Sequence, residues 1–313
     1  MSFIRNAFQT MHPVLQIVML GCMVLSFMMI ALIIGTFWLG VDAIQSAETT
    51  EMIVISDLNQ VVGFLGASLV FAGLVGREHL GGFFLKAPAA SMFGLAVLIA
   101  LGMSPLLDFT YRINEWMLVP GSALHEWAGA LEEQAAIMTK SLLSFETNFD
   151  VVVVLFSVAV LPAVCEEWLF RGTVQSLIMR ATGNIHLAVW IAAVLFSAVH
   201  MQFFGFIPRM LLGACFGYLV VFSGSLWPAI LGHFINNAGV VLSAWWMGSE
   251  WIDQGLEPQP LTTWEWSDWT IAAIAAGALI WGLKQMTLRG DSTEYLTALN
   301  PEATQPEQTP LQW

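Results

Sequence analysis

The stretch from Val14 to Leu39, VLQIVMLGCMVLSFMMIALIIGTFWL, decides the class of fold, because it holds no Asp, Glu, Lys, Arg or His. A helix needs about 20 apolar residues to cross the roughly 30 Å hydrocarbon core of a bilayer. The run is longer than the 7–15 apolar residues typical of a cleaved signal peptide. We therefore expect an uncleaved first membrane span.

Apolar stretches of the same kind recur along the chain. A soluble α-helical bundle would need charged outer faces on these helices, and most of them have none. The sequence therefore predicts an all-α fold, a polytopic transmembrane helical bundle of about eight spans. After Val14–Leu39, the expected spans are Leu58–Val75, Ser91–Leu107, Val151–Met179, Leu187–His200, Phe206–Phe222, Leu226–Trp246 and Ile271–Leu283.

The composition agrees with a membrane protein and excludes other classes. Hydrophobic residues make up 57% of the chain and charged residues 11%, with a net charge of -13, whereas a globular chain carries about 25% charged residues. This excludes a disordered chain, and the shortage of Lys and Arg argues against nucleic acid as a partner. The cysteines Cys22, Cys165 and Cys215 all lie in apolar spans, which predicts buried small hydrophobic side chains rather than disulfides.

Basic residues favour cytoplasmic loops and so predict the orientation. With the N-terminus inside, both termini are cytoplasmic and the acidic residues Asp42, Glu48, Glu51 and Asp57 fill the first outer loop. The inner segments then hold Arg5, Arg77, Lys86, Arg180, Lys284 and Arg289, and the outer segments hold Arg112, Lys140 and Arg209.

Two features are expected outside the spans. Apolar residues recur at spacings of three and four in Leu124, Trp127, Leu131, Ala135, Met138 and Leu142. This pattern predicts an amphipathic helix, which either lies on the outer membrane interface or packs on the bundle. Tryptophans cluster around the last outer loop, as is typical of an interfacial belt; they are Trp245, Trp246, Trp251, Trp264, Trp266 and Trp269.

The chain divides into four parts on these grounds. Residues 1–148 hold the N-terminal spans and the amphipathic helix, and residues 149–247 hold a core with polar residues inside its spans. Residues 248–286 hold the acidic, Trp-rich outer loop and the last span. Residues 287–313 form a tail rich in Thr, Gln, Glu and Pro, which we expect to be disordered.

A charge at mid-membrane is costly and is therefore a functional-site hypothesis. Glu167 and Arg171 are four residues apart, where an acid N-terminal to a base pairs well, while Glu166 points about 100° away around the helix. Pro162 can kink this helix, which leaves Glu166 as a free carboxylate suited to general-base chemistry. The alternative is a structural Glu–Arg pair, which leaves Glu166 unexplained.

Two further groups of polar residues follow in later spans. His200 lies one helical turn after Phe196, and alone it indicates little. His233 and Asn237 also share a helix face, with Asn236 beside them, and together they could stabilise an oxyanion. The alternative is hydrogen bonding between helices, which Asn and His commonly provide in membranes.

The order of these motifs, Glu-Glu-x-x-x-Arg, then Phe-x-x-x-His, then His-x-x-x-Asn, resembles the CPBP intramembrane protease family. This family includes the type II CAAX prenyl endopeptidases and the bacteriocin-processing or Abi proteins. The resemblance covers residues 151–246 and all seven positions: Glu166, Glu167, Arg171, Phe196, His200, His233 and Asn237. It implies that Glu166 and His200 activate a water and that His233 and Asn237 stabilise the oxyanion. Glu167, Arg171 and Phe196 would then be supporting residues.

The resemblance leaves the use of a metal open. Zinc is possible, with Glu166, His200 and His233 as its ligands, but the absence of a His-Glu-x-x-His motif favours catalysis without a cofactor. The implied partners are the lipid bilayer and a membrane peptide, which could be a prenylated or other lipid-anchored peptide. The expected location is the plasma membrane of a bacterium.

Two other functions stay open on the sequence. One is a non-catalytic membrane protein of the same family, such as an immunity or scaffold protein, in which the polar cluster serves packing. The other is a small transporter that uses Glu166 as a proton relay. The sequence has no second copy of the motif cluster, whereas transporters often contain paired repeats.

Overall fold

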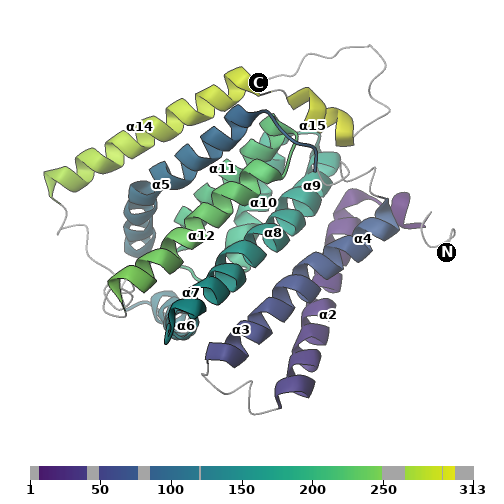
Figure 1. Ribbon diagram of the computed structural model, residues 1–313. Coiled ribbons are helices and arrows are strands. Elements are labelled where there is room, and N and C mark those ends of the chain that lie inside the picture. Colours follow the sequence, from purple (N-terminus) through teal and green to yellow (C-terminus); the bar gives the residue numbers. More distant parts are fainter. Residues whose placement is uncertain are drawn as a thin grey trace.

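The computed structural model describes residues 7–40, 49–76, 85–119, 121–248, 265–290 and 292–299. Helices dominate this part of the chain and none of it is assigned to a strand, which confirms the predicted all-α bundle (Figure 1). Two of the helices contain π-helical stretches, three in all among the described residues, in which each turn holds more residues than an α-helical turn. The single helices are α2 (Pro13–Leu39), α5 (Ala90–Met117), α6 (Ala123–Leu142), α10 (Ile185–Ala198), α11 (Phe206–Ser223), α12 (Trp227–Met247), α14 (Trp266–Arg289) and α15 (Ser292–Leu299).

Two long helices are built from consecutive segments. The first runs over 49–75 as α3 (Thr49–Leu58), the π-helical η2 (Asn59–Gly66) and α4 (Ala67–Val75). The second runs over 148–182 as α7 (Asn148–Val154), η4 (Leu155–Val160), α8 (Leu161–Glu167), η5 (Trp168–Val174) and α9 (Gln175–Thr182), with η4 and η5 π-helical. This second helix contains the predicted span Val151–Met179 as one continuous crossing.

Six of the described helices are long and apolar enough to cross a membrane, against the expected number of about eight. The two that fall short carry parts of the candidate site. Helix α10 has only 14 residues. Helix α12 has 21 residues, but His233, Asn236 and Asn237 lower its hydropathy.

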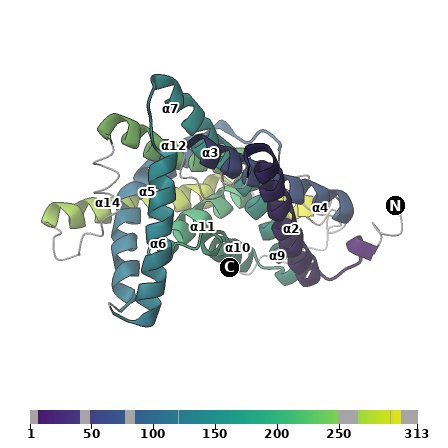
Figure 2. The ribbon, with the colours of Figure 1, turned by 90° about the horizontal axis from the view of Figure 1, so that it is seen from below.

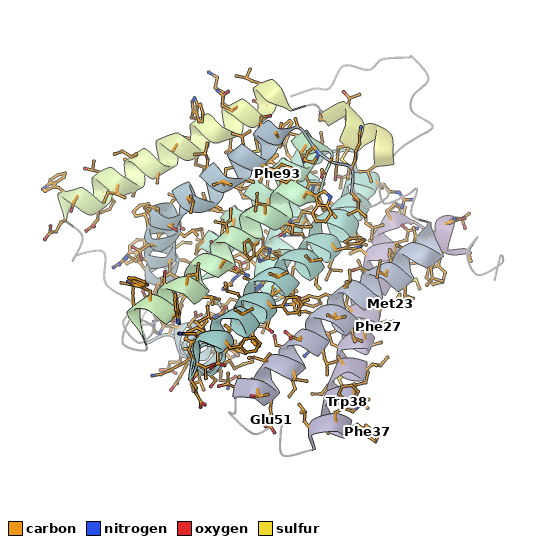
Figure 3. The ribbon with its side chains drawn as sticks, viewed as in Figure 1. Met23, Phe27, Phe37, Trp38, Glu51 and Phe93 are labelled. Carbon is orange, nitrogen blue, oxygen red and sulfur yellow. The ribbon has the colours of Figure 1, made fainter. Side chains whose placement is uncertain are left out.

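The helices form a row in which each packs on the next: α14 on α5, α5 on α12, α12 on α8, α8 on η2, and η2 on α2 (Figure 1). Helices α10 and α11 pack on each other, and α11 also contacts α5 and α12. Large apolar side chains cover the free face of α2, where Phe37 and Trp38 project outward (Figure 3). Such faces are expected where lipid, rather than water, is the neighbour.

The first outer loop differs from its prediction. Glu51 and Asp57 lie in helix α3, and Figure 3 shows Glu51 near its start. Apolar residues between the two acids favour a helix, and Ser157 Oγ donates a hydrogen bond of 2.9 Å to Asp57 Oδ2. Asp57 is therefore part of the bundle, while Asp42 and Glu48 lie outside the described residues.

The predicted amphipathic segment is confirmed as helix α6, which begins after the cap residue Ser122. Figure 2 shows it on the outside of the bundle. Leu124, Trp127 and Met138 of its apolar stripe are exposed, which fits a helix lying against lipid. The ring of Trp127 also contacts Phe203, with 4.8 Å between centroids, so α6 is attached to the segment that follows His200.

The described part of the C-terminal region differs from the expected disordered tail, whose residues 300–313 lie outside the described residues. Residues 292–299 form helix α15, which packs on α11, and the side chain of Tyr295 is fully buried. Tyr295 Oη accepts a hydrogen bond of 3.4 Å from Gln175 Nε2, and burial raises the pKa of this tyrosine to about 12. The composition is polar, but its few apolar residues, including Leu296 and Leu299, pack against the core.

Two smaller expectations have mixed outcomes. Cys165 and Cys215 are buried as predicted, but Cys22 is exposed on α2, because this helix packs on its neighbours along one side only. Of the tryptophan cluster, Trp245, Trp246, Trp266 and Trp269 lie in α12 and α14 and are exposed. Trp251 and Trp264 lie outside the described residues.

Candidate active site

Three segments bring the predicted polar residues together inside the bundle. Glu166 and Glu167 end helix α8, His200 follows α10, and His233 lies in α12. Both glutamates and His233 are buried. Buried charges in a membrane need partners, and the two glutamates obtain theirs in different ways.

Glu167 is held by two short contacts to the same oxygen. Arg171 Nη1 lies 2.7 Å from Glu167 Oε1, and His233 Nδ1 lies 2.9 Å from it. Arg171 is itself fully buried and donates through Nη2 to the carbonyl of Gly213 at 2.9 Å. The predicted Glu167–Arg171 pair is therefore present and connects η5 to α11.

Glycine on α11 permits this close approach. A Cβ on Gly213 would lie 3.2 Å from Arg171 Nη2, and one on Gly217 would lie 2.7 Å from Gln175 Oε1. Gln175 Nε2 donates to the carbonyl of Gly217 at 3.3 Å. The Gly213-x-x-x-Gly217 motif thus serves packing within the chain, where small residues let helices approach.

Glu166 is held on one side only. Its Oε1 accepts a hydrogen bond from Gln60, while its Oε2 is buried without a hydrogen-bond partner. His233 Nε2 lies 3.9 Å from Oε2 and His200 Nε2 lies 4.0 Å from it. These distances are too long for direct hydrogen bonds, so none of the printed contacts joins Oε2 directly to either imidazole.

The second nitrogen of each imidazole ring fixes which atom faces Glu166. His200 Nδ1 lies 2.8 Å from the carbonyl oxygen of Phe196, which can only accept. His233 Nδ1 faces the carboxylate of Glu167 in the same way. In a neutral ring Nδ1 is then the donor and Nε2 carries the lone pair. With both rings neutral, Glu166 Oε2 faces two further acceptors, His200 Nε2 and His233 Nε2. A water molecule has two protons and could donate to two of these three atoms.

Aromatic rings enclose the imidazoles. Phe196 packs edge-on against His200, with 5.1 Å between centroids, and against His233 at 5.9 Å. Phe216 stacks on His233 at 5.8 Å. The guanidinium of Arg171 lies 4.5 Å from the centroid of Phe196, a cation–π distance. Phe196 thus contacts both imidazoles and the guanidinium of Arg171.

Asn237 is placed apart from this convergence. Its Nδ2 donates to the carbonyl of Val158 in η4 at 3.1 Å, and its Oδ1 accepts from Asn236 Nδ2 at 3.2 Å. The amide of Asn237 thus satisfies a backbone carbonyl of a π-helical stretch. To reach an oxyanion it would have to use its second N–H or leave Val158.

Sequence reasoning did not select two polar residues of this region. Gln60 Nε2 donates to Glu166 Oε1 at 2.8 Å, and Asp57 lies one turn earlier against Ser157. Gln60 sits within the predicted span Leu58–Val75, so a search for amides as well as ionisable residues would have selected it. The sequence places Asp57 in the first outer loop, so it is not among the polar residues expected inside the spans.

The three facing atoms do not fit a zinc ion as they stand. Zinc–nitrogen and zinc–oxygen distances of about 2.1 Å place two ligands of a tetrahedral site roughly 3.4 Å apart, and the separations here are 3.9 and 4.0 Å. Within the described ranges, no group of three or more His, Cys, Asp and Glu has metal-binding geometry. We therefore derive no catalytic step through a metal.

The fold and the site together define an integral membrane protein with a buried carboxylate–histidine centre. Residues 148–239 match the family model described as type II CAAX prenyl endopeptidase Rce1-like, so the chain carries an Rce1-like domain. The match covers less than a third of the 313 residues and includes every predicted site residue. No curated protein and no solved structure matches the chain.

Proposed function

We propose that this chain is an intramembrane endopeptidase that hydrolyses a peptide bond of a membrane-anchored or membrane-embedded peptide. One observation carries the proposal: the unpartnered Oε2 of Glu166 faces the Nε2 atoms of His200 and His233 at 4.0 and 3.9 Å. The Rce1-like domain supports a peptidase. A buried carboxyl group and two imidazoles can accept and donate the protons that general acid–base hydrolysis transfers.

The first step is attack by water. A water between the three atoms donates one proton to Glu166 and is oriented by His200. As its oxygen bonds to the scissile carbonyl carbon, the proton passes to Glu166 and the carbonyl π pair moves to oxygen. General-base assistance of this kind contributes about 10²–10⁴-fold to a rate.

The tetrahedral oxyanion then needs donors. His233 donates from Nε2 if its ring has taken up a proton from solvent before the attack, and it keeps that proton through the cycle. Glu167 orients the ring through Nδ1 and offsets its positive charge, as the triad carboxylate does in serine proteases. Asn237 contributes its second amide N–H. When the C–N bond breaks, the proton held by Glu166 passes to the leaving nitrogen, which balances the hydrolysis.

Cleavage of a defined peptide by the purified, reconstituted protein tests the proposal. The first substrate to try is a prenylated peptide in proteoliposomes, because the matched family is described by that activity; an unprenylated transmembrane peptide is the second. Glu166→Gln should lower kcat/KM by about 10²–10⁴-fold without changing the amount of folded protein. Glu126→Gln on the exposed face of α6 is the matched control and should cut normally.

Normal cleavage by Glu166→Gln would sink the catalytic assignment. It would instead favour a non-catalytic immunity or scaffold role, in which the polar cluster serves packing. Activity that persists after chelation, with no stoichiometric metal in the purified protein, is the result expected of a cofactor-free mechanism.

A further inference from the structure

Gln60 joins the site from outside the Rce1-like domain. It lies in η2, in the first of the two long segmented helices, and is separated from Glu166 by 106 residues in sequence. Its side-chain amide donates to Glu166 Oε1 at 2.8 Å. The general base of the proposed reaction therefore depends on a side chain that the matched residues 148–239 do not contain.

The backbone around Gln60 is fixed from both sides. Toward the core, Asp57 accepts a hydrogen bond of 2.9 Å from Ser157 in η4, so two polar contacts join this helix to the one that carries Glu166. Toward the N-terminal span, a Cβ on Gly63 would lie only 2.8 Å from Met28 Cγ. Helix α2 thus packs directly on η2, and Gln60 has little freedom to withdraw.

The π-helical geometry also gathers around this contact. Gln60 lies at the second position of η2, η4 precedes α8, and η5 follows Glu167 directly. π-helical turns occur frequently at functional sites because they re-aim side chains. Here Gln60 lies within one such stretch, and Glu166, which it contacts, lies two residues before another.

The hydrogen bond has a consequence for the carboxylate. The last torsion of a glutamate is broad and roughly two-fold, so an unrestrained carboxylate can rotate its oxygens out of line. With Oε1 held by Gln60, the remaining oxygen, Oε2, is the one that faces His200 and His233. The side-chain oxygen of Gln60, Oε1, is buried and has no hydrogen-bond partner. The hydrogen bond from Nε2 to Glu166 therefore orients the side-chain amide.

We propose that Gln60 is a positioning residue for this reaction: it holds the Glu166 carboxylate so that Oε2 receives the proton of the attacking water. The inference rests on the proposed function, because it assigns Glu166 as the base. It extends the site beyond the Rce1-like domain to the N-terminal helices.

The test compares two nearly isosteric variants. Gln60→Met removes the donor and should lower kcat about 10–100-fold, as expected for a lost hydrogen bond to a charged group, with KM within about twofold. Gln60→Glu replaces the donor by an acceptor and should lose more. The introduced carboxyl can donate only when protonated, so activity relative to wild type should rise as the pH falls. Gln134→Met, at an exposed glutamine of α6, is the matched control.

The same assay separates this proposal from the proposed function. If Glu166→Gln cuts like wild type, the catalytic assignment fails. If Glu166→Gln is inactive while Gln60→Met keeps the wild-type kcat, only the role of Gln60 fails. A loss of activity that merely follows a loss of folded protein would also overturn it.

An infrared readout is independent of activity. The carboxylate band of Glu166, isolated as the wild-type minus Glu166→Gln difference spectrum, should shift in the Gln60→Met background. An unchanged band would mean that Gln60 does not constrain the carboxylate.

Discussion

Glu166 and Glu167 are neighbours at the end of α8, both buried, yet their surroundings are opposite in kind. One oxygen of Glu167, Oε1, makes two contacts shorter than 3 Å, to Arg171 and to His233. Glu166 accepts one hydrogen bond, from Gln60, and its other oxygen faces two imidazoles across about 4 Å. Each glutamate keeps one buried oxygen without a hydrogen-bond partner, but only that of Glu166 lies opposite both histidines.

The difference teaches how one helix end can serve two purposes. The contacts of Glu167 continue along the chain, since Arg171 and Gln175 each donate to the carbonyl of a glycine on α11. This face holds the bundle together. On the other face, Glu166 Oε2 has no hydrogen-bond partner and faces the Nε2 atoms of His200 and His233, an arrangement suited to a reactant rather than to a permanent partner.

The largest expected effect comes from removing the buried partner of Glu167. Arg171→Met removes one member of a fully buried pair and should lower the free energy of unfolding by about 3–5 kcal/mol, measured by denaturant titration in detergent micelles. The double variant with Glu167→Gln should recover part of the loss, because no charge is then left unpaired. Arg112→Met, in a pair with the exposed Asp108, is the control, with an expected loss of at most about 1 kcal/mol. If Arg171→Met and Arg112→Met lowered the free energy of unfolding equally, the structural role assigned to the contacts of Glu167 would be contradicted.

The second prediction uses the two histidines, since only His233 touches both glutamates. His233→Gln should lower both activity and stability, the latter by about 1–3 kcal/mol for a lost buried contact. His200→Gln should lower kcat about 100-fold but shift the unfolding midpoint little, because its Nδ1 contacts a backbone carbonyl of its own helix turn. Cleavage and unfolding assays on the same samples check both. Similar destabilisation by the two variants would remove the distinction between the faces.

The third prediction tests whether the contacts that begin at Glu167 and Arg171 continue to stabilise the bundle at Gln175 and Gly217. Gly217→Ala places a Cβ 2.7 Å from Gln175 Oε1 and 3.0 Å from Val189, and overpacking of this kind costs about 1–3 kcal/mol. Gly239→Ala on α12 is the matched control, because a Cβ there meets nothing within 4 Å. Thermal unfolding of both variants should show a lower midpoint for Gly217→Ala alone, and a fall at Gly239→Ala would undermine the reasoning.

The smallest expected effect lies at the far end of that face. Tyr295→Phe removes a hydroxyl that accepts from Gln175 and should cost about 1 kcal/mol, seen as a small fall in the unfolding midpoint with unchanged cleavage. A marked loss of cleavage would show that α15 acts on the site and not only on packing.

Much of this arrangement could be predicted from sequence because the membrane simplifies the rules. Long apolar runs fix the helices, and the rarity of charges in them selects Glu166, Glu167, Arg171, His200 and His233. The spacing of four residues correctly predicts the pair of Glu167 with Arg171. The match of residues 148–239 to an Rce1-like family model agrees with the resemblance read from the same motifs.

The rest depends on contacts that local patterns do not contain. The approach of Gln60 to Glu166 joins residues 106 positions apart, and nothing in either segment specifies the other. The burial of Asp57 depends on Ser157 in a different helix. Helix α15 was missed because a polar composition hides the few apolar residues that dock it. The hydrogen bond of Asn237 to the carbonyl of Val158 is not predicted either, because spacing gives only the face on which Asn237 lies.

The π-helical stretch around Gln60 has a consequence for the history of such chains. A π-helical turn corresponds to an α-helical turn with one residue added, so a single-codon deletion within 59–66 could restore a regular α-helix without breaking the span. Because the wide turn and the extra residue would be removed together, the flanking residues would keep nearly the same faces. The side chains within 59–66, including Gln60, would be re-aimed. Alignments of this segment should therefore be inspected for one-residue gaps. Such a gap would separate chains that keep the same membrane topology but present a different side chain to the carboxylate at position 166.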